Sequence, residues 1–412
     1  MTVAATNAGF RALFAPGPFR RFFASRAISL IGDAVVPTAL ALTMTELGYS
    51  PGWLGGMLAA AILPKVVFLI FGGIAADRMA KQPLMVASSI ACGSAQLITV
   101  AVLVSGASLW WALVCQGVYG VSIAAGHPAT FGYLPHCVTP QHLGAANALV
   151  GGWTGAAALL GPAITAACFA LGDAAWALAF DGVSFFLAAA LLWGLPRGAA
   201  VMDGTDRGGM SALRDGWRAM QGLPWLLRMT VVDSSILLLV SAPFMILGPA
   251  LVSQRMSANA WALLMLLFAA GELVGSLVSG RMTLPRPILA AALSLLAMGL
   301  PPLCLAAGAG LAALSVAQIL AGASVGAYGV LVTTAVQRSV PQEHLSKVGA
   351  LSSVGSFAFL PIGYVMAPLI AALTGPTPLL WAAAAWTVVS VTALASDRRL
   401  RGFRGPEGAL TH

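Results

Sequence analysis

The stretch Gly72-Gly73-Ile74-Ala75-Ala76-Asp77-Arg78 decides how this chain folds. It continues into Met79-Ala80-Lys81 and lies between two long apolar segments, at residues 52–76 and 82–105. A connection this short joins two antiparallel helices, and apolar segments of this length place those helices in a membrane. The small residues let the helices approach closely, and the Asp, Arg and Lys form a charge cluster at the lipid–water boundary. The sequence therefore predicts an integral membrane protein.

The composition supports the same class. Of 412 residues, 59% are hydrophobic and 8% are charged. A soluble domain carries about 25% charged residues, so this chain cannot cover itself with a water-facing surface. The 21 Lys and Arg outnumber the 13 Asp and Glu, but they fall in short loops and form no basic patch with aromatic residues, which excludes a nucleic-acid partner. The five cysteines are scattered through apolar segments and are interpreted as packing residues.

Apolar runs of about 20 residues predict twelve transmembrane helices in an all-α fold. The polar segment at 197–224 divides these helices into two groups of six. The predicted helices cover residues 21–46, 52–76, 82–105, 108–134, 143–170, 174–195, 225–251, 258–281, 286–306, 309–336, 347–372 and 376–396. The predicted organisation is an interfacial N-terminus at 1–20, a six-helix bundle at 21–196, a linker with an amphipathic helix at 197–224, a second six-helix bundle at 225–396 and a basic tail at 397–412.

The positive charges indicate the orientation in the membrane. If both termini lie inside, 18 of the 21 Lys and Arg fall on the cytoplasmic side. The exceptions are Arg255 in an outer loop and Arg26 and Lys65 within helices. The positive-inside rule therefore predicts cytoplasmic termini. We expect a multi-pass protein of the plasma membrane, which in a bacterium is the inner membrane.

The two halves of the chain repeat each other. Val138-Thr139-Pro140-Gln141-His142-Leu143 parallels Val340-Pro341-Gln342-Glu343-His344-Leu345, and Gly72–Arg78 parallels Gly275–Arg281, which has lost the aspartate. Gly72–Arg78 resembles the G-x-x-x-D-R loop between the second and third helices of the major facilitator superfamily. The resemblance covers residues 18–396, and it implies two parallel six-helix repeats that give alternating access to a central substrate site.

Other phrases resemble one branch of that superfamily, which holds enterobactin-type siderophore exporters and macrolide-type efflux proteins. They are Gly126-His127-Pro128-Ala129, Ala145-Ala146-Asn147-Ala148-Leu149, Gly161-Pro162-Ala163 and Gln337-Arg338-Ser339-Val340-Pro341-Gln342-Glu343. Gly161-Pro162 also resembles the export motif of the fifth helix, although its upstream glycine positions are Ala157 and Ala148. Leu113 stands where proton-coupled members often have an Arg, so a coupling scheme through that Arg does not transfer.

Ionisable side chains within the predicted helices are the candidates for proton and substrate binding, because such residues face the bundle interior or a wet cavity. Asp33 and Lys65 lie midway along the first and second helices, and Lys65 is either the counter-ion of Asp33 or an anion site. Asp33 either binds a proton or a cationic substrate, or is a structural carboxylate neutralised by Lys65. Glu272 is the second candidate carboxyl, with a hydrogen-bonded structural role as its alternative.

Two further aspartates lie in predicted helices. Asp233, near the inner end of the seventh helix, is a candidate for the same chemistry, or it pairs with Arg228. Asp181 begins the phrase Asp181-Gly182-Val183-Ser184-Phe185-Phe186, which is interpreted mainly as a packing signature.

The loop of the opening stretch is predicted to control which side of the protein is open. Its members are Gly73, Asp77, Arg78 and Lys81, and the expected partners in the other half are Arg338 and Lys347. The alternative is that the charges of this loop only set the orientation of the helices in the membrane. Polar and aromatic residues that could line a cavity are Gln116, Tyr119, His127, Tyr133, Asn147 and Trp153. Each of these, taken singly, also fits a packing role.

The sequence contains no phosphate-binding G-x-x-x-x-G-K-[ST], metal-ligand cluster or nucleophile elbow. We therefore expect neither an enzyme nor an ATP-driven pump, and no metal or cofactor beyond a proton gradient. The predicted function is proton-coupled export of a small amphipathic compound, such as a drug, a siderophore or a secondary metabolite. An importer or lipid-handling facilitator is the alternative, and a membrane sensor or scaffold is a third class. Expected partners are the small-molecule substrate and membrane lipids, and the chain is expected to act as a monomer.

Overall fold

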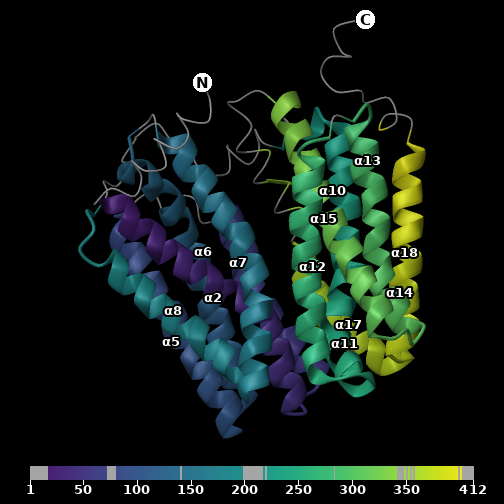
Figure 1. Cartoon of the computed structure of the whole chain (residues 1–412), viewed down its shortest axis with the longest axis horizontal. Coiled ribbons are helices and arrows are strands. Elements are labelled where there is room, and N and C mark those ends of the chain that lie inside the picture. The colour runs from purple at the N-terminus through teal and green to yellow at the C-terminus, as the bar shows by residue number, and fades with distance from the viewer. Residues whose placement is uncertain are drawn as a thin grey trace, which may run out of the picture. The chain divides into compact units, whose positions relative to one another are not determined.

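The structure is a computed structural model, and it describes residues 17–71, 80–139, 142–197, 217–218, 220–282, 284–340, 348, 351–352, 355, 358–397 and 400. Within these residues the chain forms helices joined by short connections, with no β-strand (Figure 1). The predicted all-α class is therefore confirmed. Most of the predicted amphipathic helix in the linker lies outside the described residues, apart from helical Trp217, Arg218 and Met220.

The chain divides into two compact units. Unit 1 comprises residues 1–43 and 60–206, and unit 2 comprises residues 44–59 and 207–412. The second boundary lies within the polar segment at 197–224. Residues 44–59 group with unit 2 through contacts such as that of Gly55, where an added Cβ would lie 2.1 Å from the Tyr364 carbonyl oxygen.

The helices of unit 1 follow the predicted order. They are α2 (Pro18–Glu46), α3 (Pro51–Phe71), α5 (Lys81–Ser105), α6 (Leu109–Cys137), α7 (Leu143–Leu171) and α8 (Ala175–Leu192), of which α2 and α3 also contribute to unit 2. The first helix begins before the predicted residue 21 because Phe19 and Phe22 are buried, at 3% exposure each, against Tyr133 and its neighbours. Helix α7 continues through Pro162, as expected for a proline in a membrane helix.

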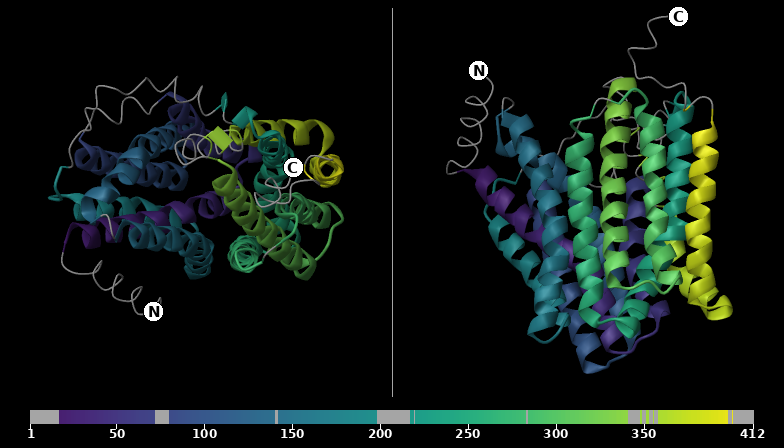
Figure 2. Two further views of the ribbon diagram at one scale, coloured as in Figure 1. Left: turned by 90° about the horizontal axis from the view of Figure 1, so that it is seen from above. Right: turned by 45° about the vertical axis from the view of Figure 1, so that its right-hand side comes forward.

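The helices of unit 2 include two irregular segments. They are α10 (Pro224–Ile236), the π-helical turn η2 (Leu237–Ser241), α11 (Ala242–Arg255), α12 (Ala258–Ser279), α13 (Pro287–Ser294), the 3₁₀ turn η3 (Leu295–Gly299), α14 (Leu300–Ala306), α15 (Leu311–Ser339), α17 (Leu360–Thr374) and α18 (Pro376–Ser396). The turns η2 and η3 interrupt the regular hydrogen bonding without ending the long helices that contain them. Helices α12, α15 and α13 run side by side (Figure 2).

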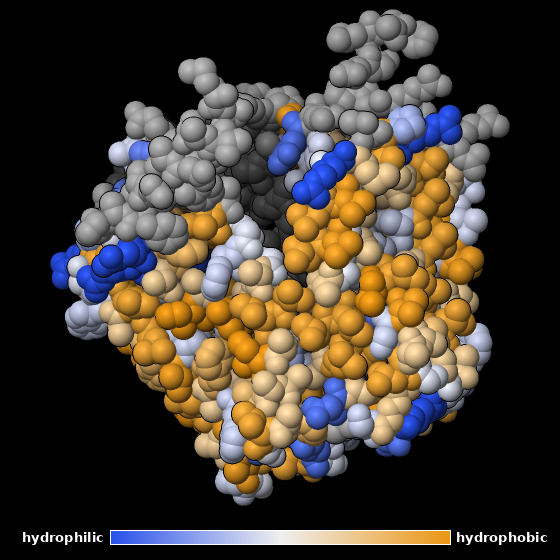
Figure 3. Space-filling view, viewed as in Figure 1, coloured by the Kyte–Doolittle hydropathy of each residue, from blue (hydrophilic) through white to orange (hydrophobic). Residues whose placement is uncertain are grey.

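Ten described helical segments are long and apolar enough to cross a membrane. Two shorter apolar helices, Pro51–Pro64 and Leu360–Thr374, fall where the second and eleventh helices are predicted. Hydrophobic side chains cover much of the visible surface of α12 and α15, whereas hydrophilic ones gather near helix ends (Figure 3). Val274, Val278 and Val316, for example, are 50–58% exposed. Such a surface suits contact with lipid, so the chain is a multi-pass membrane protein.

Candidate functional site

The site in unit 1 begins with the packing of α2 along α8. Ser25 Oγ donates a hydrogen bond to the Ala188 carbonyl oxygen over 3.0 Å. Two turns further along α2, Gly32 lies directly against α8: an added Cβ would lie 2.3 Å from both Asp181 Oδ1 and Ser184 Oγ. Only a residue without a side chain allows this approach, and it brings the middle of α2 against a carboxyl group of α8.

Asp33 follows Gly32 and is hydrogen-bonded across the unit. The Tyr119 hydroxyl of α6 donates to Asp33 Oδ1 over 2.5 Å. Tyr119 is buried, at 3% exposure, and the Phe185 ring of α8 packs edge-on against it with ring centroids 6.0 Å apart. Asp33 itself is half-buried. The carboxyl therefore has a neutral hydroxyl as a partner and is only partly enclosed.

Helix α7 supports the same part of α2. The Trp153 indole Nε1 donates to the Ala27 carbonyl oxygen over 2.9 Å. At Gly161, the glycine of the predicted export motif, an added Cβ would lie 2.3 Å from the Ala34 carbonyl oxygen. Gly161 therefore gives α7 close access to the turn of α2 that carries Asp33.

A second polar chain crosses the interior of unit 1. Gln96 Nε2 of α5 donates to Asp181 Oδ2 over 2.8 Å. Gln116 Nε2 of α6 donates to Gln96 Oε1 over 2.8 Å and to Thr99 Oγ1 over 3.3 Å. All four side chains are 0% exposed. Hydrogen bonds between these side chains reduce the cost of placing polar groups in the interior of a membrane protein.

Unit 2 has an aspartate and a tyrosine on the corresponding helices. Asp233 lies on α10 and Tyr328 on α15, which begin and end the first four helices of the second half. Arg228, considered above as a partner of Asp233, forms its ion pair with Asp397 beyond the end of α18.

Glu272 lies where α12 and α15 pack backbone against backbone. Gly271 and Gly275 of α12 face Gly322 and Gly326 of α15, and a Cβ added to any of the four would lie 1.9–2.2 Å from a carbonyl oxygen of the facing helix. Glycines four residues apart are a common device for such close contact in membranes. The Glu272 side chain is half-buried, and no hydrogen bond or ion pair joins it to another described residue.

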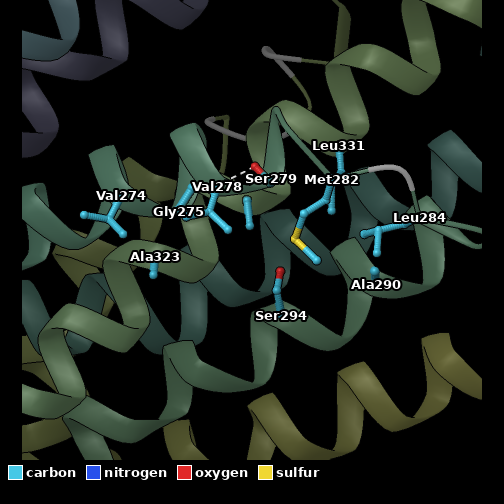
Figure 4. A pocket seen from close by; sticks show the side chains of 11 residues that line it. Val274, Gly275, Val278, Ser279, Met282, Leu284, Ala290, Ser294, Ala323 and Leu331 are labelled. Atoms are coloured by element: carbon cyan, nitrogen blue, oxygen red, sulfur yellow. Dashed lines mark hydrogen bonds between the residues drawn. The ribbon is translucent and has the colours of Figure 1, made fainter.

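A hollow of about 330 Å³ opens between α12, α13 and α15, beginning within one turn of Glu272 (Figure 4). Its lining is almost entirely apolar, and it includes Val274, Val278, Met282, Ala290 and Leu331. The Ser279 and Ser294 hydroxyls donate to backbone carbonyl oxygens, over 2.7 and 2.8 Å, to Gly275 and Ala291. None of the predicted site residues lines this hollow, and it offers a ligand little beyond hydrocarbon contact.

The remaining predicted residues have varied places. Tyr133 is buried, and its hydroxyl donates to the Pro196 carbonyl oxygen over 2.7 Å, which ties α6 to the chain after α8. Lys81 is nearly buried at the start of α5. Outside the described part lie the loop residues Gly73, Asp77, Arg78 and Lys347 and the side chains of Lys65, His127, Asn147 and Arg338. The expected pairing of Asp33 with Lys65 therefore also lies outside it.

Four residues of this arrangement were not singled out from the sequence: Gly32, Gln96, Thr99 and Tyr328. Gln96 and Thr99 are polar residues in an otherwise apolar helix, which is the signal that could have indicated them. Tyr328 could have been found by comparing the fourth helix of each half. Gly32 carried no signal of its own, because many glycines occur in the predicted helices.

Comparison with known proteins gives a family and a fold. A family model described as "Major Facilitator Superfamily" matches residues 22–282. The "Uncharacterized MFS-type transporter YfiS" of Bacillus subtilis (strain 168) is 24% identical over 357 residues, which cover 81% of this chain and 82% of that protein.

Among solved structures, the nucleoside transporter NupG aligns with a TM-score of 0.71 at 10% identity, covering 93% of this chain and 98% of its own. A D-xylose-proton symporter aligns with a TM-score of 0.66 at 12% identity, covering 91% and 96%. At these identities the likeness concerns the fold.

Proposed function

This chain belongs to the Major Facilitator Superfamily, and we propose that it is a secondary transporter that exports a small amphipathic compound in exchange for protons. The observation that carries the proposal is the half-buried Asp33 carboxyl, held by the Tyr119 hydroxyl in the middle of α2. A carboxyl in this position can bind a proton in one state and a cationic or polar group of the substrate in another.

The electrostatics of the site favour a neutral or cationic substrate. The Tyr119 hydroxyl donates a hydrogen bond to Asp33 but carries no positive charge, so it does not neutralise the carboxyl. Proton binding removes the negative charge and with it the attraction for a cation. Competition between a proton and the substrate for one carboxyl is sufficient to couple their movements in opposite directions.

Asp233 and Glu272 are proposed as further proton- or substrate-binding carboxyls of unit 2, and Lys65 as a counter-ion. The position of Asp233 on the first helix of the second half, which corresponds to that of Asp33 on α2, supports this role. Alternating access would then change the exposure of one aspartate in each half.

The direction of transport rests on sequence features. Gly161-Pro162 and the phrases that resemble the siderophore-exporter and macrolide-efflux branch favour export. The close contact of Gly161 with the Ala34 carbonyl explains why a glycine is needed at this position of α7. We further propose cytoplasmic termini, location in the plasma membrane and action as a monomer. Gly73, Asp77, Arg78, Lys81 and Arg338 are proposed to stabilise one of the two access states.

The proposal can be tested in two stages. Cells that lack or overproduce the protein are exposed to a panel of amphipathic toxic compounds, and export predicts that loss increases susceptibility. A compound found in this way is then followed in proteoliposomes with an imposed pH gradient, with wild type, Asp33→Asn and the control Asp173→Asn. Asp173 caps α8 through the Ala175 amide at 2.7 Å, and asparagine retains that function.

We expect a gradient-driven flux that Asp33→Asn abolishes and Asp173→Asn leaves intact. Transport that ignores the pH gradient and is unchanged in Asp33→Asn would overturn proton coupling. If cells that lack the protein could no longer grow on a particular nutrient, an importer would be favoured instead.

A further inference from the structure

The hollow between α12, α13 and α15 lies wholly within unit 2 and opens at the surface of membrane-spanning helices. Along its α12 wall, Val274, Val278 and Met282 are 50–56% exposed (Figure 4). A hollow with exposed hydrocarbon walls on a membrane helix is suited to contact with lipid.

The few polar groups of this hollow already have partners. The polar side chains of its lining are Ser279 and Ser294. Their hydroxyls donate to the Gly275 and Ala291 carbonyl oxygens over 2.7 and 2.8 Å. A polar ligand would therefore gain little here, whereas a hydrocarbon chain can fill the space of about 330 Å³.

An arginine continues the α12 wall at the end of the helix. Arg281 follows Val274 by seven residues and Val278 by three, and residues at these spacings share one face of a helix. The Arg281 amide donates to the Val278 carbonyl oxygen over 3.1 Å, so the turn continues past the last residue of α12. The Arg281 side chain is exposed.

A second arginine continues the α13 wall at the same end of the hollow. Arg286 is the N-cap of α13, and its carbonyl oxygen accepts the Ala290 amide over 3.0 Å. Arg286, Ala290 and Ser294 are four residues apart, and the last two line the hollow. The Arg286 side chain is exposed. The connection at 280–286 contains two arginines and no acidic residue, so it attracts anions.

The dimensions match one leaflet of a bilayer. The α12 wall from Val274 to Arg281 covers seven residues, or about 10 Å of helix. The hydrocarbon core of a bilayer is about 30 Å thick, so each leaflet supplies about half of that depth. Because both spans end at the connection, the arginines lie at the membrane surface, where lipid phosphates are found.

We propose that the hollow is a binding site for an anionic phospholipid of the surrounding bilayer. One acyl chain lies between α12, α13 and α15, and the headgroup phosphate is bound by Arg281 and Arg286, whose guanidinium groups suit phosphate oxygens. Basic residues at the ends of membrane helices are a known means of binding anionic headgroups. This site does not depend on the substrate, direction or coupling of transport.

Native mass spectrometry of the delipidated full-length protein tests the proposal. The protein in detergent is titrated with phosphatidylglycerol, which is anionic, or with phosphatidylcholine of the same acyl chains, which is not. One arginine near the surface contributes about a fivefold preference for anionic lipid, and two contribute about 25-fold. We expect wild type to bind phosphatidylglycerol about 25-fold more tightly, and added salt to reduce this preference.

Two pairs of substitutions test the role of the arginines. Arg281→Gln with Arg286→Gln should lower the affinity for phosphatidylglycerol to that for phosphatidylcholine. The control, Arg20→Gln with Arg197→Gln, removes the same charge from exposed positions of unit 1 and should keep the preference. Equal affinities of the two lipids in wild type would overturn the proposal, and so would a preference that survives in the Arg281 and Arg286 variant.

A third comparison tests the place of the acyl chain. Ala290→Leu fills part of the hollow and should remove the site for both lipids, whereas Ala312→Leu adds the same atoms to an exposed position of α15 and should change neither affinity. Unchanged binding in a folded Ala290→Leu variant would show that the chain lies elsewhere. If Ala290→Leu does not fold, the exposed arginines still decide the outcome. A transported compound that displaces the bound lipid would overturn the proposed occupant.

Discussion

The Tyr119 hydroxyl donates a hydrogen bond to Asp33 Oδ1 over 2.5 Å and thereby joins α6 to α2. The bond fixes the position of the Asp33 side chain between these two helices of unit 1. A transport cycle based on Asp33 would therefore depend on the Tyr119 hydroxyl.

Tyr119→Phe removes that donor and retains the ring that packs on Phe185. A hydrogen bond to a charged group contributes about 1.5–3 kcal/mol, so its loss should leave the Asp33 side chain less firmly placed. The rate of substrate transport should fall by about tenfold or more. Tyr133→Phe is the control: this hydroxyl bonds the Pro196 carbonyl oxygen, and its loss should leave the rate of transport unchanged. Equal rates for all three proteins would contradict the role of Tyr119.

The ion pair between Arg228 and Asp397 joins α10 to the residue that follows α18. The Arg228 side chain is 42% exposed, so the pair should contribute less than about 1 kcal/mol and weaken at high salt. Arg228→Ala and Asp397→Ala should each lower the thermal unfolding temperature slightly in detergent at low salt. The double variant should unfold at a temperature no lower than that of the less stable single variant, because either single change already removes the ion pair. Fully additive losses would show that the two residues act separately.

The sequence was sufficient for the class and most of the helix order. Hydropathy and length alone locate the spans, because a lipid-facing helix must be apolar over about 20 residues. The boundaries at 46, 105, 306 and 396 agree with the structure. The start of α2 was placed too late because Phe19 and Phe22 seemed suited to an interface, whereas their burial depends on neighbours distant in sequence.

The partners of the buried carboxyls could not be predicted. Asp33 and Tyr119 are 86 residues apart, and Gln96 and Asp181 are 85 apart. Whether two such side chains meet depends on the rotation of each helix about its axis. The positions of polar residues in an apolar helix are only a weak indication of that rotation. The interpretation of Asp181 as packing was incomplete for this reason. Its phrase does pack against α2 through Ser184 and against α5 through Gly182, but its carboxyl also joins a polar chain.

A substitution at Gly322 tests the close packing of α12 against α15 next to Glu272. In Gly322→Ala the new Cβ would lie 1.9 Å from the Phe268 carbonyl oxygen and 2.9 Å from the Glu272 amide nitrogen, so α12 and α15 must separate. We expect a loss of stability of about 1–3 kcal/mol, measured as a lower unfolding temperature. Gly329→Ala, on the same helix, meets no atom within 4 Å and should be neutral or slightly stabilising. Equal effects of the two changes would contradict the close packing.

Gly32 offers the sharpest test of the contact between α2 and α8. Gly32→Ala would place a methyl group 2.3 Å from Asp181 Oδ1 and from Ser184 Oγ, so the two helices must move apart or the carboxyl must turn away. Overpacking of this kind costs about 1–3 kcal/mol, and the unfolding temperature should fall. Gly151→Ala in α7, where nothing lies within 4 Å, is the matched control.

The close approach at Gly32 should matter for transport as well, because Asp33 follows Gly32 on α2. Gly32→Ala should therefore slow substrate transport, whereas Gly151→Ala should leave the rate unchanged. If Gly32→Ala lowered the unfolding temperature no more than Gly151→Ala does, the tight contact between α2 and α8 would be contradicted.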